Sequence, residues 1–194
     1  MQDNYTAGVV LVGGKSSRMG SNKALLQMGE FRLVDYIANV LRHSGIEKKD
    51  IYVSGDVDGF PKIVDLYPNK GPVGGICSSL MECYTRKYKQ AVIVPVDMPL
   101  FSPDLVKMLI EDGNFDISHF QNNPLPLCIK IDEETLKYSR KINKELKNDK
   151  DISVKAFLKD LNVKIIKAPE KMVRGLANTN TPEEWREVAN EYKN

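Results

Sequence analysis

An apolar run followed at once by a glycine-rich, cationic loop is the feature that most constrains how this chain folds. Residues 8–12 read Gly-Val-Val-Leu-Val, which predicts a buried β-strand. The glycine-rich loop occupies residues 13–23, and an amphipathic helical pattern follows it. The apolar positions of that pattern are Leu33, Ile37, Val40 and Leu41. A strand, a glycine-rich loop and a helix in this order are typical of α/β proteins that hold a nucleotide where a parallel strand ends.

The residue types within this loop suit an anionic ligand. Gly13 and Gly14 lack Cβ atoms, so their backbone amides can approach phosphates or a base edge closely. Arg18 adds a planar cationic fork, and Lys23 adds a mobile point charge. Neither the dinucleotide fingerprint G-x-G-x-x-G nor a Walker A loop occurs here. The alternative is a surface turn with two solvated cations, and the motifs further along the chain weigh against it.

Length and composition predict one cytoplasmic domain. The chain has 194 residues, of which 42% are hydrophobic and 28% charged, as is usual for a globular domain. A formal net charge of +2 gives no support to nucleic-acid binding. The cysteines Cys77, Cys83 and Cys128 show no CxxC spacing, which favours reduced thiols in the cytosol. No apolar run approaches the length of a membrane span. We therefore expect neither a nucleic acid nor a membrane as a partner.

Strand and helix patterns alternate along the chain. This alternation predicts an α/β fold with a mostly parallel central sheet and helices on both faces. The later strands are predicted at 51–53, 62–64, 91–96, 116–120, 127–131 and 163–166, with a turn at 122–124. The later helices are predicted at 76–84, 103–111, 132–142, 154–161 and from Thr181 onward. The polar segment 143–151 is expected to be an exposed connection.

The last predicted helix begins with a capping box. Thr181 is expected to cap it, and Glu184 stands at the third helical position. Its buried side chains are expected to be Trp185, Val188, Ala189 and Tyr192.

Asp97 is the strongest single candidate for chemistry. It follows the most apolar predicted strand, at the position where open α/β sheets bind their ligands. A carboxylate there suits Mg²⁺, which takes one or two carboxylates together with waters and substrate phosphates. The alternative is an acid that caps the turn before Pro99.

These motifs resemble those of the molybdenum cofactor nucleotidyltransferases, the MobA-like members of the GT-A nucleotidyltransferase group. Residues 11–23 (LVGGKSSRMGSNK) are similar to the signature loop of the family, and residues 96–99 (VDMP) to its acid-x-Pro motif. Residues 71–75 (GPVGG) are similar to the Gly-Pro-Leu-Ala-Gly segment beside the nucleotide. Residues 176–182 (LANTNTP) are similar to the Asn-x-Asn-Thr-Pro stretch beside the acceptor. The resemblance covers almost the whole chain.

The resemblance implies a single-domain, Rossmann-like GT-A fold over residues 1–194. Its nucleotide-binding part is expected at about 1–112 and its acceptor-binding part at about 113–194. The implied reaction transfers GMP from GTP to the phosphate of molybdenum-molybdopterin, which yields molybdopterin guanine dinucleotide and pyrophosphate. Mg²⁺ is the implied cofactor. GTP and molybdopterin are the implied substrates, and molybdoenzymes or their chaperones are further expected partners.

The resemblance also implies roles for particular residues. The catalytic residues would be Arg18, Lys23 and Asp97, with Asp97 as the metal ligand. The nucleotide-binding residues would be Leu11, Val12, Gly13, Gly14, Lys23, Ser54, Asp65, Gly71, Gly74 and Asp97. Asn178 and Asn180 would bind the acceptor, whereas Thr181 is expected to be structural. This chain carries Ser54 where close relatives have an asparagine that contacts the base, and Val12 where the family usually has alanine.

The choice of base depends on Gly13-Gly14. Family members that use GTP carry Gly-Gly here, where the cytidylyl enzymes usually carry Ala-Gly, because a glycine leaves room for a purine edge. Three alternatives remain at this point. The chain could be a cytidylyltransferase acting on the same pterin, a sugar-1-phosphate nucleotidylyltransferase, or a non-catalytic nucleotide-binding or delivery module. Retention of both Lys23 and Asp97 argues against the last of these.

Overall fold

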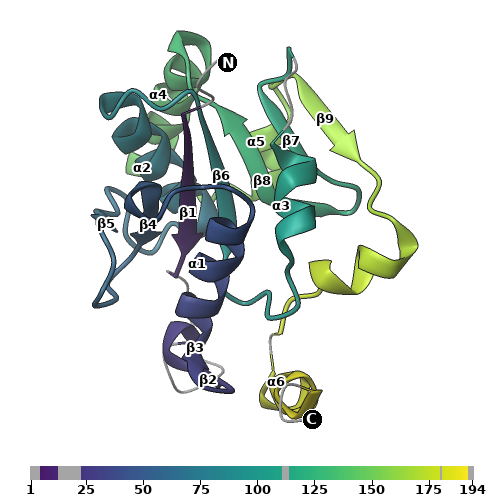
Figure 1. The fold of residues 1–194 in the computed structure, drawn as a ribbon. Coiled ribbons are helices and arrows are strands. Elements are labelled where there is room, and N and C mark those ends of the chain that lie inside the picture. Colours follow the sequence, from purple (N-terminus) through teal and green to yellow (C-terminus); the bar gives the residue numbers. More distant parts are fainter. Residues whose placement is uncertain (1–4, 13–22, 111–113, 180, 192–194) are drawn as a thin grey trace.

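One seven-stranded sheet runs through the whole fold. A computed structural model describes residues 5–12, 23–110, 114–179 and 181–191. The strands lie in the order β5-β4-β1-β6-β8-β7-β9 (Figure 1). Their bounds are β1 (Thr6–Leu11), β4 (Ile51–Ser54), β5 (Lys62–Ile63), β6 (Gln90–Pro95), β7 (Ile117–Phe120), β8 (Asn123–Lys130) and β9 (Val163–Ile166).

Helices connect most of these strands. The α-helices are α1 (Leu33–His43), α2 (Gly71–Thr85), α3 (Pro103–Leu109), α4 (Glu133–Lys147), α5 (Val154–Leu158) and α6 (Pro182–Glu191). Short 3₁₀ turns are η2 (Lys23–Leu25), η3 (Lys48–Asp50) and η4 (Glu170–Leu176). A separate two-stranded hairpin pairs β2 (Gln27–Met28) with β3 (Phe31–Arg32). The hairpin and η4 were not predicted from the sequence.

The sheet is mostly parallel, as predicted. The strands β5, β4, β1 and β6 pair in parallel, and β7 pairs in parallel with β9. Only the pairings of β8 with β6 and β7 are antiparallel among the described strands of this sheet. The carboxyl ends of β5, β4, β1 and β6 therefore meet at one edge, where a ligand site is expected.

The sheet separates two hydrophobic cores, because successive side chains of a strand point to opposite faces. On β1, Val10 packs in the core that contains α1 and α3, whereas Val9 and Leu11 pack in the core that contains α2, α4 and α5. Figure 1 shows these two groups of helices on either side of the sheet. The expectation of helices on both faces is confirmed.

The helix α4 is longer than predicted. The sequence predicts that it ends near Ile142 and that 143–151 is an exposed connection, but α4 continues to Lys147. Asn143 and Leu146 are only 6% and 1% exposed, because they extend the face that packs against α2. The polarity of the segment concealed this face, which includes a buried amide. The true connection between α4 and α5 is confined to residues 148–153.

The turn before β8 is tighter than predicted. The strand begins at Asn123 rather than at Leu127, so the predicted turn at 122–124 is wrong in its extent. The chain reverses through Gln121 and Asn122 alone, and Asn122 adopts a φ of 65°. Asparagine tolerates this left-handed conformation better than most residues, which permits a short hairpin turn.

Other predicted boundaries also differ. The helix α2 begins at Gly71 rather than at Ile76, so the glycine-rich segment 71–75 forms its first turns, and α5 ends at Leu158 rather than at Leu161. The strand β5 ends at Ile63, and Val64, which was expected to continue it, is 75% exposed. The helix α3 extends to Leu109, and its predicted end near Glu111 falls outside the described residues.

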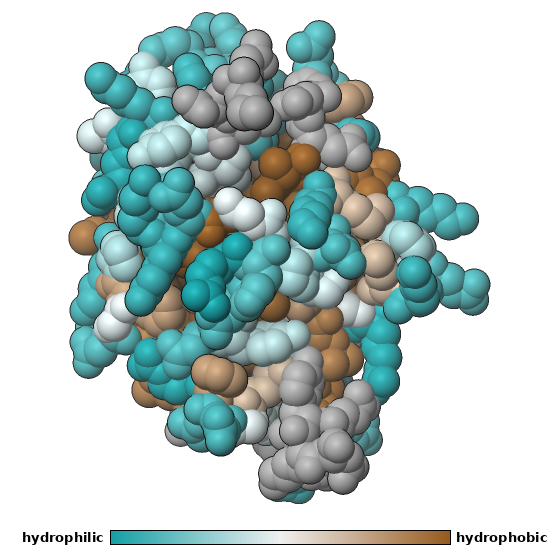
Figure 2. All heavy atoms as spheres, in the orientation of Figure 1, coloured by the Kyte–Doolittle hydropathy of each residue, from teal (hydrophilic) through white to brown (hydrophobic). Residues whose placement is uncertain are grey.

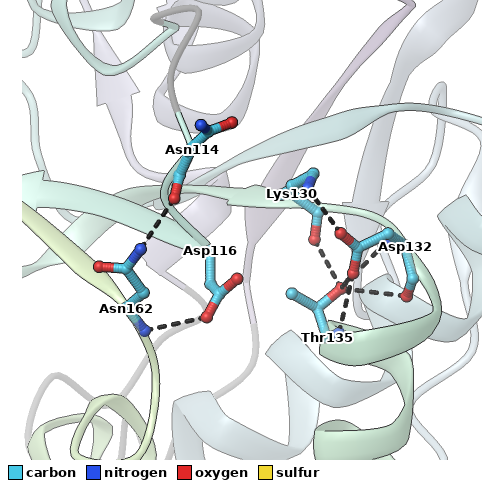
Figure 3. A network of polar contacts seen from close by, with 6 residues as sticks. All are labelled: Asn114, Asp116, Lys130, Asp132, Thr135 and Asn162. Carbon is cyan, nitrogen blue, oxygen red and sulfur yellow. Dashed lines mark hydrogen bonds and ion pairs between the residues drawn. The ribbon is translucent and has the colours of Figure 1, made fainter.

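Two groups of polar contacts lie at the start of α4 and at the β7–β9 edge (Figure 3). The Lys130 amide links them by donating to the Asp116 carbonyl at 2.9 Å. We call the two groups together the β8–α4 network, and its residues are Asn114, Asp116, Lys130, Asp132, Thr135 and Asn162. Asp132 caps α4: its Oδ1 accepts from the Thr135 amide at 3.0 Å, and its Oδ2 lies 2.8 Å from Lys130 Nζ. Asp116 Oδ2 accepts from the Asn162 amide at 2.9 Å. These bonds anchor the second half of the sheet.

The carboxyl-terminal helix starts as predicted. Thr181 Oγ1 accepts from the Glu184 amide at 3.2 Å, and Glu184 Oε2 accepts from the Thr181 amide at 3.1 Å, which completes the capping box. Trp185 is half-buried against the α1–α3 core, and Val188 is half-buried as well. The predicted burial of Ala189 and Tyr192 concerns side chains outside the described part.

No helix within the described ranges is both long and apolar enough to cross a membrane. Figure 2 shows one face of the molecule, where hydrophilic residues cover most of the coloured surface and hydrophobic ones occupy smaller areas between them.

Candidate functional site

The central strand β1 places two candidate regions side by side at the carboxyl edge of the sheet. Leu11, its last residue, is in register with Ser54 of β4 on one side and with Pro95 of β6 on the other. Neighbouring strands lie about 4.8 Å apart, so Ser54 and Pro95 are separated by roughly 10 Å. The β4 side and the β6 side therefore lie close enough for one nucleotide to reach both.

On the β6 side, three residues form what we call the Lys23–Asp97 corner: Lys23, Asp97 and Thr179. Lys23 Nζ lies 3.3 Å from Asp97 Oδ2 and donates to the Thr179 carbonyl at 2.9 Å. The Thr179 amide in turn donates to the Asp97 carbonyl at 2.8 Å. The corner thus brings the end of the signature loop, the acid-x-Pro motif and the carboxyl-terminal motif into direct contact.

One oxygen of the Asp97 carboxylate has no hydrogen-bond partner in the described part of the chain. Asp97 Oδ1 is buried and accepts no hydrogen bond from the described residues, although Oδ2 faces Lys23. Burying a carboxylate oxygen without a partner costs free energy. An oxygen in this state indicates a site where a ligand supplies a hydrogen-bond donor or a cation.

The donor set around Asp97 fits Mg²⁺ held mainly by a substrate. Among the described residues, no three His, Cys, Asp or Glu side chains gather in a way that would hold a metal ion by themselves. Mg²⁺ usually keeps several waters and binds one or two carboxylates together with substrate phosphates. A single carboxylate with a spare buried oxygen matches that pattern and does not match an all-protein metal cage.

On the β4 side lies a cavity of about 730 Å³, which we call the strand-end cavity. Leu11, Ser54, Asp65 and Gly71, all predicted to bind the nucleotide, line it together. Its volume is within the range usual for sites that bind small ligands. Lys23, Asp97 and Gly74 are not among its lining residues.

Gly74 and Gly75 at the start of α2 lie against different parts of the structure, so the absence of a Cβ has a different consequence at each. A Cβ on Gly75 would lie 3.0 Å from Leu11 Cδ2 and 3.2 Å from Ser54 Oγ, and Gly75 lines the cavity. A Cβ on Gly74 would lie 2.8 Å from the Tyr67 carbonyl oxygen, so Gly74 allows α2 to pack against the preceding loop.

Asp65 is partly committed to holding the loop before α2. Its Oδ1 accepts from the Tyr67 amide at 2.9 Å and lies 3.3 Å from Ser78 Oγ. The same Ser78 hydroxyl accepts from the Leu66 amide at 3.0 Å. Asp65 therefore shapes the cavity wall as well as facing the cavity.

One part of the cavity lining was not predicted from the sequence. Asp151, Ile152 and Ser153, all in the α4–α5 connection, line it together with residues of the strand ends. Lys70 also lines it and donates to Asp149 Oδ1 at 2.7 Å, which ties this connection to the start of α2. In the sequence, the only local indication of this lining is Lys70, directly before Gly71. Nothing in the sequence pairs that lysine with a segment about eighty residues away.

Several predicted site residues lie elsewhere. Val12 is half-buried and its amide donates to the Ser54 carbonyl at 3.1 Å, next to the cavity. Asn178 is exposed and directly precedes Thr179 of the Lys23–Asp97 corner. Gly13, Gly14, Arg18 and Asn180 fall outside the described residues.

The thiols are poor nucleophiles. All three cysteines are buried and free. Burial raises the pKa of Cys77 to about 11 and that of Cys128 to about 12, so both stay protonated near neutral pH. This environment gives no support to a covalent cysteine intermediate.

Relatives with known names match the chain over nearly its full length. A molybdenum cofactor guanylyltransferase from Xanthomonas euvesicatoria is 30% identical over 184 residues, which cover 95% of this chain and 94% of the relative. A probable molybdenum cofactor guanylyltransferase from Carboxydothermus hydrogenoformans is 29% identical, with 92% of each chain covered.

Solved structures share the fold. Molybdopterin-guanine dinucleotide biosynthesis protein A from Archaeoglobus fulgidus superimposes with a TM-score of 0.75 at 17% identity, covering 96% of this chain and 98% of that one. A CMP:2-keto-3-deoxy-manno-octonic acid synthetase complexed with CTP gives a TM-score of 0.70 at 10% identity, covering 97% and 98%. The expected nucleotidyltransferase fold is thereby confirmed.

The sequence profile of the MobA-like NTP transferase domain matches residues 8–170. With this match, and with a 30% identical relative aligned over almost the whole chain, the protein belongs to the MobA-like NTP transferase family.

Proposed function

We propose that this chain is a molybdenum cofactor guanylyltransferase. It transfers GMP from GTP to the phosphate of molybdenum-molybdopterin and releases pyrophosphate. An oxygen of the pterin phosphate monoester attacks the α-phosphorus of GTP, and the bond from that phosphorus to the bridging β-phosphate oxygen breaks. The products are molybdopterin guanine dinucleotide and pyrophosphate. The names of the full-length relatives support this assignment.

The observation that carries the proposal is the Lys23–Asp97 corner beside the strand-end cavity. A cation and a carboxylate with a spare buried oxygen meet where β1 and β6 end, about two strand spacings from the cavity at β4. This arrangement suits a nucleotide whose base occupies the cavity and whose phosphates reach Asp97. A module that only binds nucleotides needs no such pair.

In this mechanism the protein positions the reactants and neutralises charge, because phosphoryl chemistry of this kind needs no covalent protein intermediate. Lys23, together with Arg18 of the signature loop, stabilises negative charge on the departing pyrophosphate. The hydrogen bonds of Thr179 hold the Asp97 backbone and the Lys23 ammonium in fixed relation. Gly13 and Gly14 border the base or the ribose.

Mg²⁺ is the proposed cofactor, and Asp97 would hold it through Oδ1, which accepts no hydrogen bond from the described residues. When bound, the ion polarises the α-phosphate and neutralises developing charge. Asp97 contributes the negative charge that favours a cation at this position.

The acceptor is proposed to bind beside Thr179. Asn178 directly precedes this threonine, whose amide is bonded to the Asp97 backbone, so Asn178 stands next to the proposed phosphate site. Asn180, which lies outside the described residues, is proposed to bind the acceptor as well. The division into a nucleotide part at about 1–112 and an acceptor part at about 113–194 belongs to this proposal. Cytoplasmic location and delivery of the product to a molybdoenzyme or its chaperone also belong to it. Three buried free thiols support the reducing compartment.

Nucleotide titration followed by turnover tests the proposal. Calorimetric titration with GTP, CTP and ATP, each with Mg²⁺, is expected to give the tightest binding with GTP. Pyrophosphate release is then measured with molybdopterin as acceptor, with and without Mg²⁺, and is expected only in its presence.

The other outcomes point to specific alternatives. Preference for CTP would make the chain a cytidylyltransferase and remove the argument from Gly13-Gly14. Binding of GTP without pyrophosphate release, in the presence of the pterin, would indicate a delivery module. Absence of binding to any nucleotide would refute the reading of the whole site.

A further inference from the structure

The lining of the strand-end cavity includes a segment of the proposed acceptor part that carries none of the sequence motifs. Asp151, Ile152 and Ser153 line the cavity together with Ser54, Asp65 and Gly75. They belong to the connection between α4 and α5, far in sequence from the motifs of the nucleotide site. A ligand in this cavity therefore meets the α4–α5 connection directly.

This connection is anchored on both sides of Asp151. Before it, the Asp149 amide donates to the Leu146 carbonyl at 3.2 Å, and Asp149 Oδ1 accepts from Lys70 Nζ at 2.7 Å. After it, Ser153 Oγ accepts from the Ala156 amide at 3.1 Å and caps α5. The half-buried Ile152 packs against the core between the sheet and α2. The backbone of Asp151 is thus held in place before any ligand arrives.

The Asp151 carboxylate is available to a ligand. It makes no hydrogen bond or ion pair with any residue in the described part of the chain. The other carboxylate in the cavity wall, Asp65, already uses its Oδ1 to hold the Tyr67 amide. Asp151 therefore has both carboxylate oxygens available to a ligand, whereas Asp65 does not.

Guanine matches this pair of acceptors better than other bases do. Its Watson–Crick edge presents two adjacent donors, N1–H and the N2 amino group, which a carboxylate can accept together. The same edge of cytosine or adenine presents one amino donor beside a ring-nitrogen acceptor, which would face a carboxylate oxygen without a proton between them. A carboxylate at this wall thus selects for guanine and against both alternatives.

We propose that Asp151 is the specificity-determining residue that accepts N1–H and the N2 amino group of the donor guanine, so that the α4–α5 connection completes the base pocket. This inference rests on the proposed use of GTP. Asp151 touches the base and not the reacting phosphates, so it acts on donor choice.

The test is a change of base preference in equilibrium titrations with Mg²⁺. Xanthosine triphosphate (XTP) carries a carbonyl where guanine carries the N2 amino group. In Asp151→Asn, the amide oxygen still accepts N1–H while the amide NH₂ donates to that carbonyl. We expect Asp151→Asn to weaken GTP binding about 10- to 100-fold and to tighten XTP binding by a similar factor. Improved XTP binding cannot result from misfolding.

Asp149→Asn is the matched control, since it removes the same charge two residues away while its amide oxygen can still accept the hydrogen bond from Lys70 that anchors the connection. It should leave the ratio of GTP to XTP affinity as in the unaltered protein. A second readout uses inosine triphosphate, which lacks the N2 amino group: Asp151→Ala should abolish any preference for GTP over it.

Each other outcome is decisive. If the unaltered protein binds GTP and Asp151→Asn keeps its ratio of GTP to XTP affinity, the role of Asp151 is refuted while the proposed function stands. A switch of equal size in Asp149→Asn would show that charge alone acts, which also refutes the contact. If the unaltered protein binds no GTP, the proposed function itself fails.

Discussion

Two polar clusters of this molecule use their carboxylates in opposite ways. In the β8–α4 network, Asp132 engages both of its oxygens, one with the Thr135 amide and the other with Lys130 (Figure 3). In the Lys23–Asp97 corner, Asp97 engages Oδ2 only, and its buried Oδ1 has no partner among the described residues.

The difference separates structural from functional polar groups. Asp132 stands at a helix start, where satisfying backbone donors stabilises the fold. Asp97 stands at a strand end, where the fold tolerates an unsatisfied oxygen because a ligand satisfies it later. Substitution should therefore affect activity in one cluster and stability in the other.

Asp97→Asn should produce the largest effect. The amide keeps the shape but loses the charge that would hold Mg²⁺, so we expect pyrophosphate release to fall about 100-fold or more. The free energy of unfolding should change by less than about 1 kcal/mol, because the ion pair with Lys23 is partly exposed to solvent. Initial rates and denaturant titration measure the two quantities. A normal rate would remove Asp97 from the chemistry.

Lys23→Gln should reduce turnover next, by about 10- to 100-fold, because it removes a positive charge that stabilises the departing pyrophosphate. GTP affinity should fall as well. The comparison variant is Lys107→Gln, which removes an exposed lysine paired with Asp104 on α3. Steady-state kinetics should distinguish the two lysines. Equal behaviour of the two variants would contradict the role of Lys23.

Asp132→Ala should act on stability alone. Loss of the α4 cap and of the Lys130 contact should lower the free energy of unfolding by about 0.5–2 kcal/mol. Turnover at a temperature where the variant is folded should match that of the unaltered protein. Urea denaturation and initial rates test both statements. A large loss of turnover in the folded variant would contradict the assignment of the β8–α4 network to stability and of the Lys23–Asp97 corner to activity.

The smallest expected effect is the pH dependence of the stability that Asp132 contributes. Burial opposes ionisation of Asp132, but the hydrogen bonds from Lys130 and Thr135 outweigh it and lower the pKa of this carboxyl. A lowered pKa stabilises the fold above the unfolded value of about 3.9, and this stabilisation is lost as pH falls through the folded value. The stability difference between the unaltered protein and Asp132→Ala should therefore be constant from pH 7 to 5 and shrink below pH 4. Urea midpoints across this range measure it, and an unchanged difference at pH 3 would contradict the assignment.

Most elements of the fold follow from local patterns. The strand before the signature loop, the alternation of strands and helices, and the capping box at Thr181 depend on residues within a few positions of one another. For the same reason Asp97 could be placed at the end of a buried strand. The extent of α4 could not be predicted, because Asn143 is polar and only its packing beside α2 shows that it belongs to a buried face.

The composition of the site divides in the same way. The sequence by itself determined the loop, the acid and the glycines at the strand ends, because a parallel sheet brings the carboxyl ends of its strands to one edge. Only the tertiary structure decided that Thr179 bonds to both Lys23 and Asp97, and that Asp151 lines the same cavity as Ser54. These contacts join segments about 80 to 160 residues apart, and strand order and helix packing, which no local pattern encodes, determine them.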